Sequence, residues 1–235
     1  MKTTHCDFYA QETDVPVKDS FKNIANYLAD LKDSNLTLGD IGCAIGEFPN
    51  YLSGRFPNFD VRGYEYSQLL IDEGRKRFKG LRIEKFDASD FNSMPPASLD
   101  IITMLGTLGI FDDYEAVLKN CLDWLKPGGR LAVHNMFNDY DLDVFVKYKR
   151  SHEPKGSPLE HGWNIPSVTS VGNFLKAYGV ADFVFHDFEI SVDIAKKPED
   201  PVRSWTERTE TGGRRIMNGL CLQQPHKFLI VNKKK

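Results

Sequence analysis

The sequence predicts an α/β fold with a doubly wound sheet, and three observations support this prediction. Leu36 to Asp40 has the composition of a buried strand, and it leads into a glycine-containing turn and a helix that opens at Glu47. Further strand-like runs alternate with segments of helical spacing. A proline- and glycine-containing turn at 125–129 then leads into another strand. Regular alternation of strands and helices is typical of a sheet that is covered on both faces.

The first turn has the features of a ligand cradle. A strand that ends in such a turn brings backbone N–H groups and a helix N-terminus up to a ligand, and glycine permits a close approach. The same turn without a ligand is a common structural element, so both interpretations stay open at this point. If the turn binds a cofactor, the residues that we expect to contact it are Asp40, Gly42, Cys43, Ala44 and Gly46.

The second and third predicted strands each end in an acidic residue. Val61 to Glu65 reads as a strand about twenty positions after the glycine turn, where a doubly wound sheet places a carboxylate beside a ribose. Glu65, with Tyr66 after it, is therefore a candidate for ribose binding; the alternative is a solvated strand end. Residues 81–86 alternate as a third strand and lead into Asp87 and Ala88.

The fourth and fifth strands complete a recognisable set of motifs. Residues 98–104 read as a strand, Tyr114 to Leu125 has helical spacing, and Leu-Lys-Pro-Gly-Gly precedes the strand at 130–133. This turn is similar to the one before the fifth strand of class I S-adenosylmethionine-dependent methyltransferases. The spacing Asp-x-Gly-x-Ala-x-Gly at 40–46 resembles the first motif of the same family more than the Gly-x-Gly-x-x-Gly motif of nicotinamide enzymes. Ala44 departs from the family, which most often has glycine there.

The resemblance implies a fold and a cofactor. The fold would be a seven-stranded sheet in the order 3-2-1-4-5-7-6 with strand 7 antiparallel. The cofactor would be S-adenosylmethionine, with S-adenosylhomocysteine as the product. By position in the family motifs, Asp87 would accept from the adenine amino group while the Ala88 N–H donates to the ring, and Leu105, after the fourth strand, would also contact the cofactor.

Composition limits the other possibilities. With 235 residues, of which 41% are hydrophobic, we expect a single domain over 1–235. The sequence has no apolar run long enough to span a membrane, and the polar segment 1–14 lacks a signal-peptide pattern, so we expect a cytoplasmic protein. Four scattered cysteines suggest neither zinc nor disulfides. A net charge of −3 argues against an extended nucleic-acid surface.

The N-terminal segment, residues 1–33, is expected to form a helical cover. Ser20 to Leu31 carries apolar residues at helical spacing, which fits a helix on one face of the sheet or over the cofactor. A helix that only packs against the sheet, without a role at the cofactor, is the simpler interpretation. Tyr9 lies upstream, where enzymes of this family often fold a segment over the cofactor, and loose residues without a role are the alternative.

Two insertions distinguish the chain from a minimal sheet. The first, 138–166, follows the fifth strand and should emerge at the carboxyl edge of the sheet, where ligands bind. We expect it to contact the acceptor through Tyr148, Arg150 and Trp163, although Lys147, Lys149 and Arg150 are also compatible with a solvated helix. After a helix over 169–178 and a strand over 183–193, the second insertion, 195–225, precedes the last strand, 226–231.

The second insertion reads as a hairpin around Gly212 and Gly213. Its candidate acceptor contacts are Trp205 and Arg208. The hairpin is either half of a lid over the acceptor or a contact in a homodimer. Arg208 and Arg214 can instead pair with Glu207 and Glu210 across it.

Two histidines are candidates for the catalytic base. His134 ends the fifth strand, where the acceptor would meet the methyl group, and His161 lies in the first insertion. Asn135, next to His134, is a candidate for binding the acceptor. A structural histidine is the alternative at position 134. No Asn-Pro-Pro-Tyr sequence follows the fourth strand, which removes the feature by which amino-methylating DNA enzymes, and some RNA and protein enzymes, hold a planar nitrogen. Asp139, Asp141 and Asp143 fit the start of a helix better than a metal site, so we expect no metal.

These observations together predict an S-adenosylmethionine-dependent methyltransferase that acts at oxygen on a small or medium-sized polar acceptor. A sugar or another glycan-related molecule would suit the polar and aromatic insertions. The alternatives are an RNA or protein methyltransferase, and a non-catalytic protein that binds S-adenosylmethionine.

Overall fold

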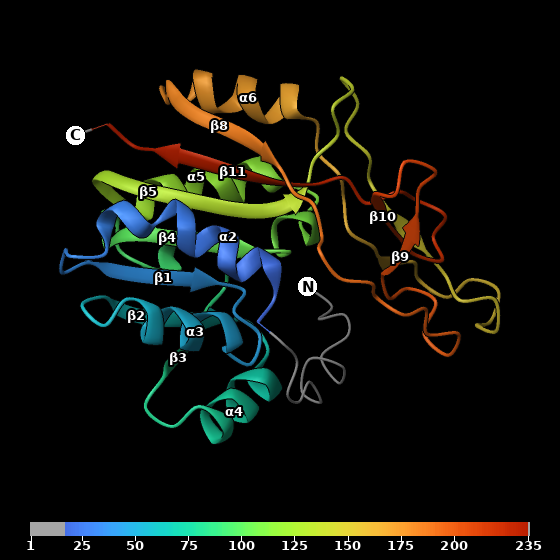
Figure 1. The fold of residues 1–235 in the computed structure, drawn as a ribbon, viewed down its shortest axis with the longest axis horizontal. Coiled ribbons are helices and arrows are strands. Elements are labelled where there is room, and N and C mark those ends of the chain that lie inside the picture. Colours follow the sequence, from blue (N-terminus) through green and yellow to red (C-terminus); the bar gives the residue numbers. More distant parts are fainter. Residues whose placement is uncertain (1–16, 235) are drawn as a thin grey trace.

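A computed structural model describes residues 17–234, and a seven-stranded sheet lies at its centre (Figure 1). The order is β3-β2-β1-β4-β5-β11-β8. β11 runs antiparallel to both β5 and β8, whereas the other pairs are parallel. The strands span Thr37–Ile41 (β1), Asp60–Glu65 (β2), Arg82–Lys85 (β3), Leu99–Leu105 (β4), Leu125–Met136 (β5), Asp182–Asp187 (β8) and His226–Asn232 (β11). The predicted fold, with its order 3-2-1-4-5-7-6, is confirmed.

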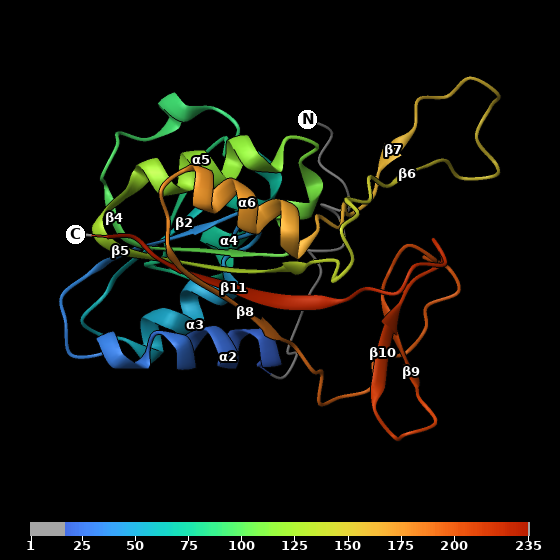
Figure 2. The same ribbon diagram turned by 90° about the horizontal axis from the view of Figure 1, so that it is seen from above.

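Helices cover both faces of this sheet (Figure 2). They span Asp19–Tyr27 (α2), Glu47–Arg55 (α3), Gln68–Arg77 (α4), Tyr114–Trp124 (α5) and Val168–Ala177 (α6), with short 3₁₀ turns at Ala29–Leu31 (η1), Phe91–Ser93 (η2) and Leu108–Ile110 (η3). α2 and α3 pack on one face through a buried apolar cluster that includes Ile24 and Leu52. α5 and α6 pack on the other through a cluster that includes Leu118 and Leu175.

Side-chain caps fix two helix starts. The Asp113 carboxylate accepts from the Ala116 N–H at 3.0 Å and begins α5, and the Ser167 hydroxyl accepts from the Ser170 N–H at 2.9 Å and begins α6. The predicted turn at 125–129 is part of β5 instead. Leu125 already pairs with Leu99 before the register shifts, and Gly128, at φ 80°, bends the strand without breaking it.

Both insertions lie beyond the carboxyl ends of the parallel strands (Figure 2). The first contains the two-stranded sheet of β6 (Lys147–Tyr148) and β7 (Glu160–His161), and the described structure has no helix within 138–166. The second contains the hairpin of β9 (Trp205–Arg208) and β10 (Arg214–Met217), as predicted. An ion pair between Arg150 and Asp200, at 3.9 Å, joins the two insertions.

β8 is shorter than the strand predicted over 183–193. Its pairing with β11 ends at Asp187, which lies opposite Lys227 near the start of β11, so the chain beyond has no neighbouring strand. Within residues 17–234, no helix is long and apolar enough to cross a membrane. Tyr9 and the start of the expected N-terminal cover lie outside the described residues. The single-domain organisation stays a prediction.

Candidate functional site

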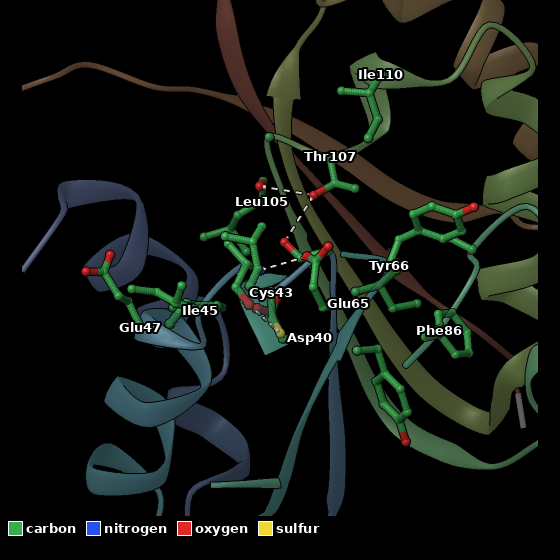
Figure 3. Close-up of a pocket in the computed structure, with 18 of the residues that line it drawn as sticks. Asp40, Cys43, Ile45, Glu47, Glu65, Tyr66, Phe86, Leu105, Thr107 and Ile110 are labelled. Atoms are coloured by element: carbon green, nitrogen blue, oxygen red, sulfur yellow. Dashed lines mark hydrogen bonds between the residues drawn. The ribbon is translucent and has the colours of Figure 1, made fainter. Parts of the chain in front are cut away.

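A pocket opens where β1, β2 and β4 end (Figure 3). It is lined by residues from three predicted motifs: the glycine turn, the end of β2 and the segment after β3. Of the residues predicted to contact a cofactor, those that line it are Asp40, Gly42, Cys43, Ala44, Glu65, Tyr66, Asp87, Ala88 and Leu105. The chain thus brings together groups that lie up to sixty-five positions apart in the sequence.

The turn after β1 has the backbone conformation that its glycines allow. Gly42 has φ 75° and Gly46 has φ 90°, both in the left-handed region. A Cβ atom on Gly42 would lie 2.2 Å from the Thr107 hydroxyl, so no larger residue fits there. Gly46 is the N-cap of α3 rather than a lining residue. Ala44 also lies in the left-handed region, at φ 50°, which explains why glycine is usual at this position in the family.

The Glu65 carboxylate faces the pocket, and two backbone N–H groups hold it in place (Figure 3). One oxygen accepts from the Ala44 N–H at 3.0 Å and the other from the Ser67 N–H at 2.7 Å. Burial raises the pKa of Glu65, and these two N–H donors counteract that rise. Each carboxylate oxygen has a further lone pair, so the group can still accept from the two hydroxyls of a ribose.

Asp40 lies beneath the turn and is only 3% exposed. Its carboxylate accepts from the Thr103 hydroxyl at 2.7 Å, which ties the end of β1 to β4. Burial raises the pKa of Asp40 to about 7; the hydrogen bond from Thr103 lowers it, and the nearby Glu65 charge adds to the rise. This geometry gives Asp40 a role in holding the turn.

The remaining walls combine an acidic group with apolar surface. One oxygen of Asp87 accepts from the Ser89 N–H at 2.9 Å and from the Ser89 hydroxyl at 2.6 Å, which fixes the carboxylate at the end of β3. Phe86, Leu105 and Ile110 provide apolar surface around it. Such a mixture suits a flat aromatic base with a polar edge.

The start of α3 disfavours a phosphate ligand. Helix N-termini attract anions, but Glu47 already places a carboxylate in the first turn of α3 and lines the pocket. Glu47 pairs with Lys18 at 3.2 Å and with Arg77 at 3.8 Å. A dinucleotide would bring its pyrophosphate against this carboxylate. The lining therefore fits a nucleoside without phosphate, such as S-adenosylmethionine.

His134 and Asn135 do not reach the pocket lining. The His134 ring is buried between Phe188 and His226, and burial lowers its pKa well below the usual value. The Asn135 side chain is also buried; its oxygen accepts from the Gly109 N–H at 3.0 Å and its nitrogen donates to the Met136 carbonyl at 2.8 Å. Their predicted catalytic and acceptor-binding roles gain no support from these positions.

His161 has partners within its own insertion. The Lys147 ammonium lies 2.6 Å from its Nδ1 and 2.6 Å from the Asp112 carboxylate. An ammonium group can only donate, so Nδ1 is the acceptor in this contact. His161 also lies outside the pocket lining, so its predicted catalytic role gains no support from its position.

The residues predicted to bind the acceptor are dispersed. Trp163 lines the pocket. Tyr148 donates to Glu160 at 3.0 Å, Arg150 lies 3.7 Å from the same carboxylate, and Trp205 donates to Glu207 at 3.1 Å. Arg208 and Arg214 both pair at 2.7 Å with Asp193, and not with Glu207 or Glu210 across the hairpin.

The three carboxylates Asp139, Asp141 and Asp143 in the first insertion each have a partner, but they do not start a helix as predicted. Asp143 accepts from the Ser167 N–H at 2.6 Å and Asp141 from the Thr169 hydroxyl at 2.5 Å, both at the start of α6. Asp139 lies 3.0 Å from the Lys227 ammonium. Within residues 17–234 no group of three His, Cys, Asp or Glu side chains is arranged to hold a metal ion.

Several lining residues were not among those predicted from the sequence; they include Lys18, Phe21, Glu47, Thr107 and Ile110. Glu47 could have been predicted from the sequence, because it directly follows the glycine turn. Lys18 and Phe21 carry no local signal, since only the packing of α2 against α3 brings them to the pocket.

Comparison with known proteins agrees with this geometry. A family profile described as "Methyltransferase domain" matches residues 40–131. Phosphoethanolamine N-methyltransferase 1 of Arabidopsis thaliana is 26% identical over 156 residues, which are 63% of this chain and 29% of that protein. Trans-aconitate 2-methyltransferase of Deinococcus radiodurans is 32% identical over 95 residues, 40% of this chain and 35% of that protein. The chain thus spans about a third of the length of these relatives.

A solved structure agrees over a longer stretch. The YcgJ protein of Bacillus subtilis superposes with a TM-score of 0.59 at 12% identity, covering 91% of this chain and 99% of that one. At this identity the likeness concerns the fold alone. The profile match covers the glycine turn, Glu65 and Asp87, which are motifs that meet around the pocket. The profile match and the arrangement of its motifs around the pocket support a class I S-adenosylmethionine-dependent methyltransferase.

Proposed function

We propose that this protein transfers a methyl group from S-adenosylmethionine to an oxygen atom of a small or medium-sized polar acceptor. The observation that carries the proposal is the convergence of the glycine turn, Glu65 and Asp87 on one pocket. When bound, the cofactor supplies an electrophilic methyl group on a sulfonium. Transfer is an in-line displacement, so the protein has mainly to align the two reactants and to exclude water.

The lining residues have distinct roles in this proposal. Glu65 accepts from the ribose hydroxyls, and the N–H groups of Ala44 and Ser67 keep its carboxylate in place. Asp87 and the Ala88 N–H bind the edge of the adenine. Asp40 holds the turn through Thr103 and does not itself contact the reacting atoms.

The pocket lining favours an acceptor oxygen that carries no proton at neutral pH. Of the described residues that line the pocket, none is a histidine, and His134 is buried away from it. A carboxylate can be methylated without a base, whereas a sugar hydroxyl needs one. We therefore place a carboxylate ahead of the sugar that the composition of the insertions suggests. The name of the trans-aconitate 2-methyltransferase relative points to the same chemistry.

Methyl-labelled cofactor tests this proposal. Purified protein is incubated with it and with separate fractions of small anionic metabolites, neutral metabolites, RNA and protein from a cell extract. We expect label in the small anionic fraction, and we expect mild alkali to release it, because methyl esters hydrolyse where ethers and N-methyl groups persist. Label in RNA or protein would favour the rival acceptors. Cofactor binding without transfer to any fraction would support the non-catalytic alternative.

A further inference from the structure

Trp163 reaches the cofactor pocket from a distant part of the chain. It belongs to the first insertion, after β7, yet it lines the same pocket as Gly42, Glu65 and Asp87. The predicted role of the first insertion was acceptor binding alone. Its position beside the nucleoside-binding motifs calls for a different assignment of Trp163.

The neighbouring Asn164 fixes this placement. Asn164 is 2% exposed, and its backbone N–H donates to the Gly109 carbonyl at 2.6 Å. Its side-chain nitrogen donates to the Phe111 carbonyl at 3.1 Å and to the Asp112 carboxylate at 3.0 Å. Its side-chain oxygen accepts from the Val146 N–H at 2.9 Å. One buried residue thus fastens the segment carrying Trp163 to η3 and to the strand-like stretch before β6.

The η3 turn is also held by Asn135. The Asn135 oxygen accepts from the Gly109 N–H at 3.0 Å, so Gly109 is clamped between Asn135 and Asn164. A Cβ atom on Gly109 would lie 2.8 Å from the Asn164 carbonyl oxygen, which leaves no room for a larger residue. Trp163 therefore has a fixed position relative to the sheet.

The η3 segment to which Trp163 is fastened also lines the pocket. Ile110 and Phe111, which follow the clamped glycine, line the pocket together with Trp163. Phe111 belongs to the same buried apolar cluster as Phe86 and Ala88, which flank Asp87. The η3 segment and the segment after β3 thus pack into one apolar cluster, and both line the pocket.

We infer that Trp163 is part of the nucleoside half of the cofactor site, where its indole contacts the adenosine moiety, and that Asn164 is the residue that positions it. This inference rests on the proposed function only in that the ligand is an adenosyl compound. An indole offers a large flat apolar surface on which a base can stack.

Calorimetry with two ligands tests the assignment. S-Adenosylhomocysteine carries both halves of the cofactor, and 5′-methylthioadenosine carries the nucleoside half without the amino-acid end. We expect Trp163→Ala to weaken the binding of both ligands about tenfold, and Trp163→Phe to weaken it much less. Unchanged affinity of Trp163→Ala for both ligands would overturn the assignment. Failure of the wild-type protein to bind either ligand would instead overturn the proposed function.

Fluorescence supplies a second readout that is independent of affinity. The chain has three tryptophans, and Trp124 is fully buried in the core while Trp205 lies on β9. Saturation with S-adenosylhomocysteine should change the emission of the wild-type protein and of Trp205→Phe, but not that of Trp163→Phe. A ligand-induced change that persists in Trp163→Phe would count against contact. Asn164→Ala should reproduce part of the Trp163→Ala loss; an unaltered affinity would exclude the positioning role.

Discussion

The rings of His134 and His226 stack with their centroids 4.9 Å apart and their planes inclined by 19°. The ring of Phe188 lies edge-on to His134 at 4.8 Å. His134 Nε2 and His226 Nδ1 are buried and have no hydrogen-bond partner within the described structure. Burial lowers the pKa of both imidazoles, that of His226 to about 4, so the pair is neutral at pH 7.

Acid should therefore destabilise the protein through this pair. Between the unfolded pKa of about 6.5 and the folded pKa of His226 at about 4, the unfolded chain binds more protons than the folded one, so stability falls as pH falls. We expect His226→Gln to reduce the pH slope of the unfolding free energy in this window, by up to about 1.4 kcal/mol per pH unit. Urea denaturation from pH 4 to 8 measures it. The control is His152→Gln at an exposed position, and parallel curves for wild type and His226→Gln would refute the expectation.

Loss of the Glu65 carboxylate should weaken cofactor binding. Charge-assisted hydrogen bonds contribute about 1.5 to 3 kcal/mol each, so Glu65→Ala should lower the affinity for S-adenosylhomocysteine at least about tenfold. Because the variant also leaves the Ala44 and Ser67 N–H groups without their acceptor, Glu65→Gln is made in parallel to keep the shape. Glu84→Ala, at an exposed site on β3, is the matched control. Equal affinities in calorimetry for wild type and both Glu65 variants would contradict the ribose assignment.

Ala44→Gly should stabilise the protein slightly. The left-handed conformation of Ala44 costs roughly 1–2 kcal/mol, whereas glycine adopts it freely but adds about 0.4–1 kcal/mol of unfolded-chain entropy. The net expectation is a gain of less than about 1 kcal/mol in unfolding free energy. Ala25→Gly, within α2, is the control. It should lower the unfolding free energy, because no left-handed strain is relieved there. A destabilised Ala44→Gly variant would show that the alanine methyl makes a favourable contact.

Shortening the β9–β10 hairpin separates a lid from an oligomer contact. Residues 206–216 are replaced by a short turn, which also removes the Arg208 and Arg214 pairs with Asp193. We expect cofactor affinity to be retained and transfer to the labelled fraction to collapse, as for a lid. Light scattering on both proteins provides the contrasting measurement, since a lower assembly mass with transfer preserved would identify the hairpin as a homodimer contact.

Methyl transfer should proceed without added metal. Asp139, Asp141 and Asp143 have partners in Lys227, Thr169 and Ser167, so a cation would have to displace these contacts. We expect a chelator to leave the initial rate of transfer unchanged. If the chelator abolishes transfer and magnesium restores it, the acidic triplet has a role that these contacts do not reveal.

Local patterns were enough to predict the sheet and the cofactor motifs. Strand periodicity, the glycine turn and the terminal carboxylates Glu65 and Asp87 each depend on a few neighbouring residues, and the structure brings them to one pocket. Strand length was harder to predict, because β8 ends where its partner β11 begins and not where its alternating pattern ends.

The acceptor side was least predictable. Residues in the insertions take partners from other segments, as Arg208 does with Asp193 and Arg150 with Asp200, and no sequence pattern announces such pairs. At His134 the pattern predicted the end of a strand but not the direction of the side chain, which packs in a cluster with Phe188 and His226. Asn164 was overlooked because its four partners lie up to fifty-five positions away.

The clamp of Gly109 between Asn135 and Asn164 gives the two halves of the site a route for thermodynamic linkage. An acceptor that displaces the first insertion would carry Trp163 with it, and so would alter the free energy of nucleoside binding. Linkage is reciprocal, so the nucleoside would change the affinity for the acceptor by the same factor. The order in which the two ligands bind, and the release of the demethylated nucleoside, would then both depend on the buried side chain of Asn164.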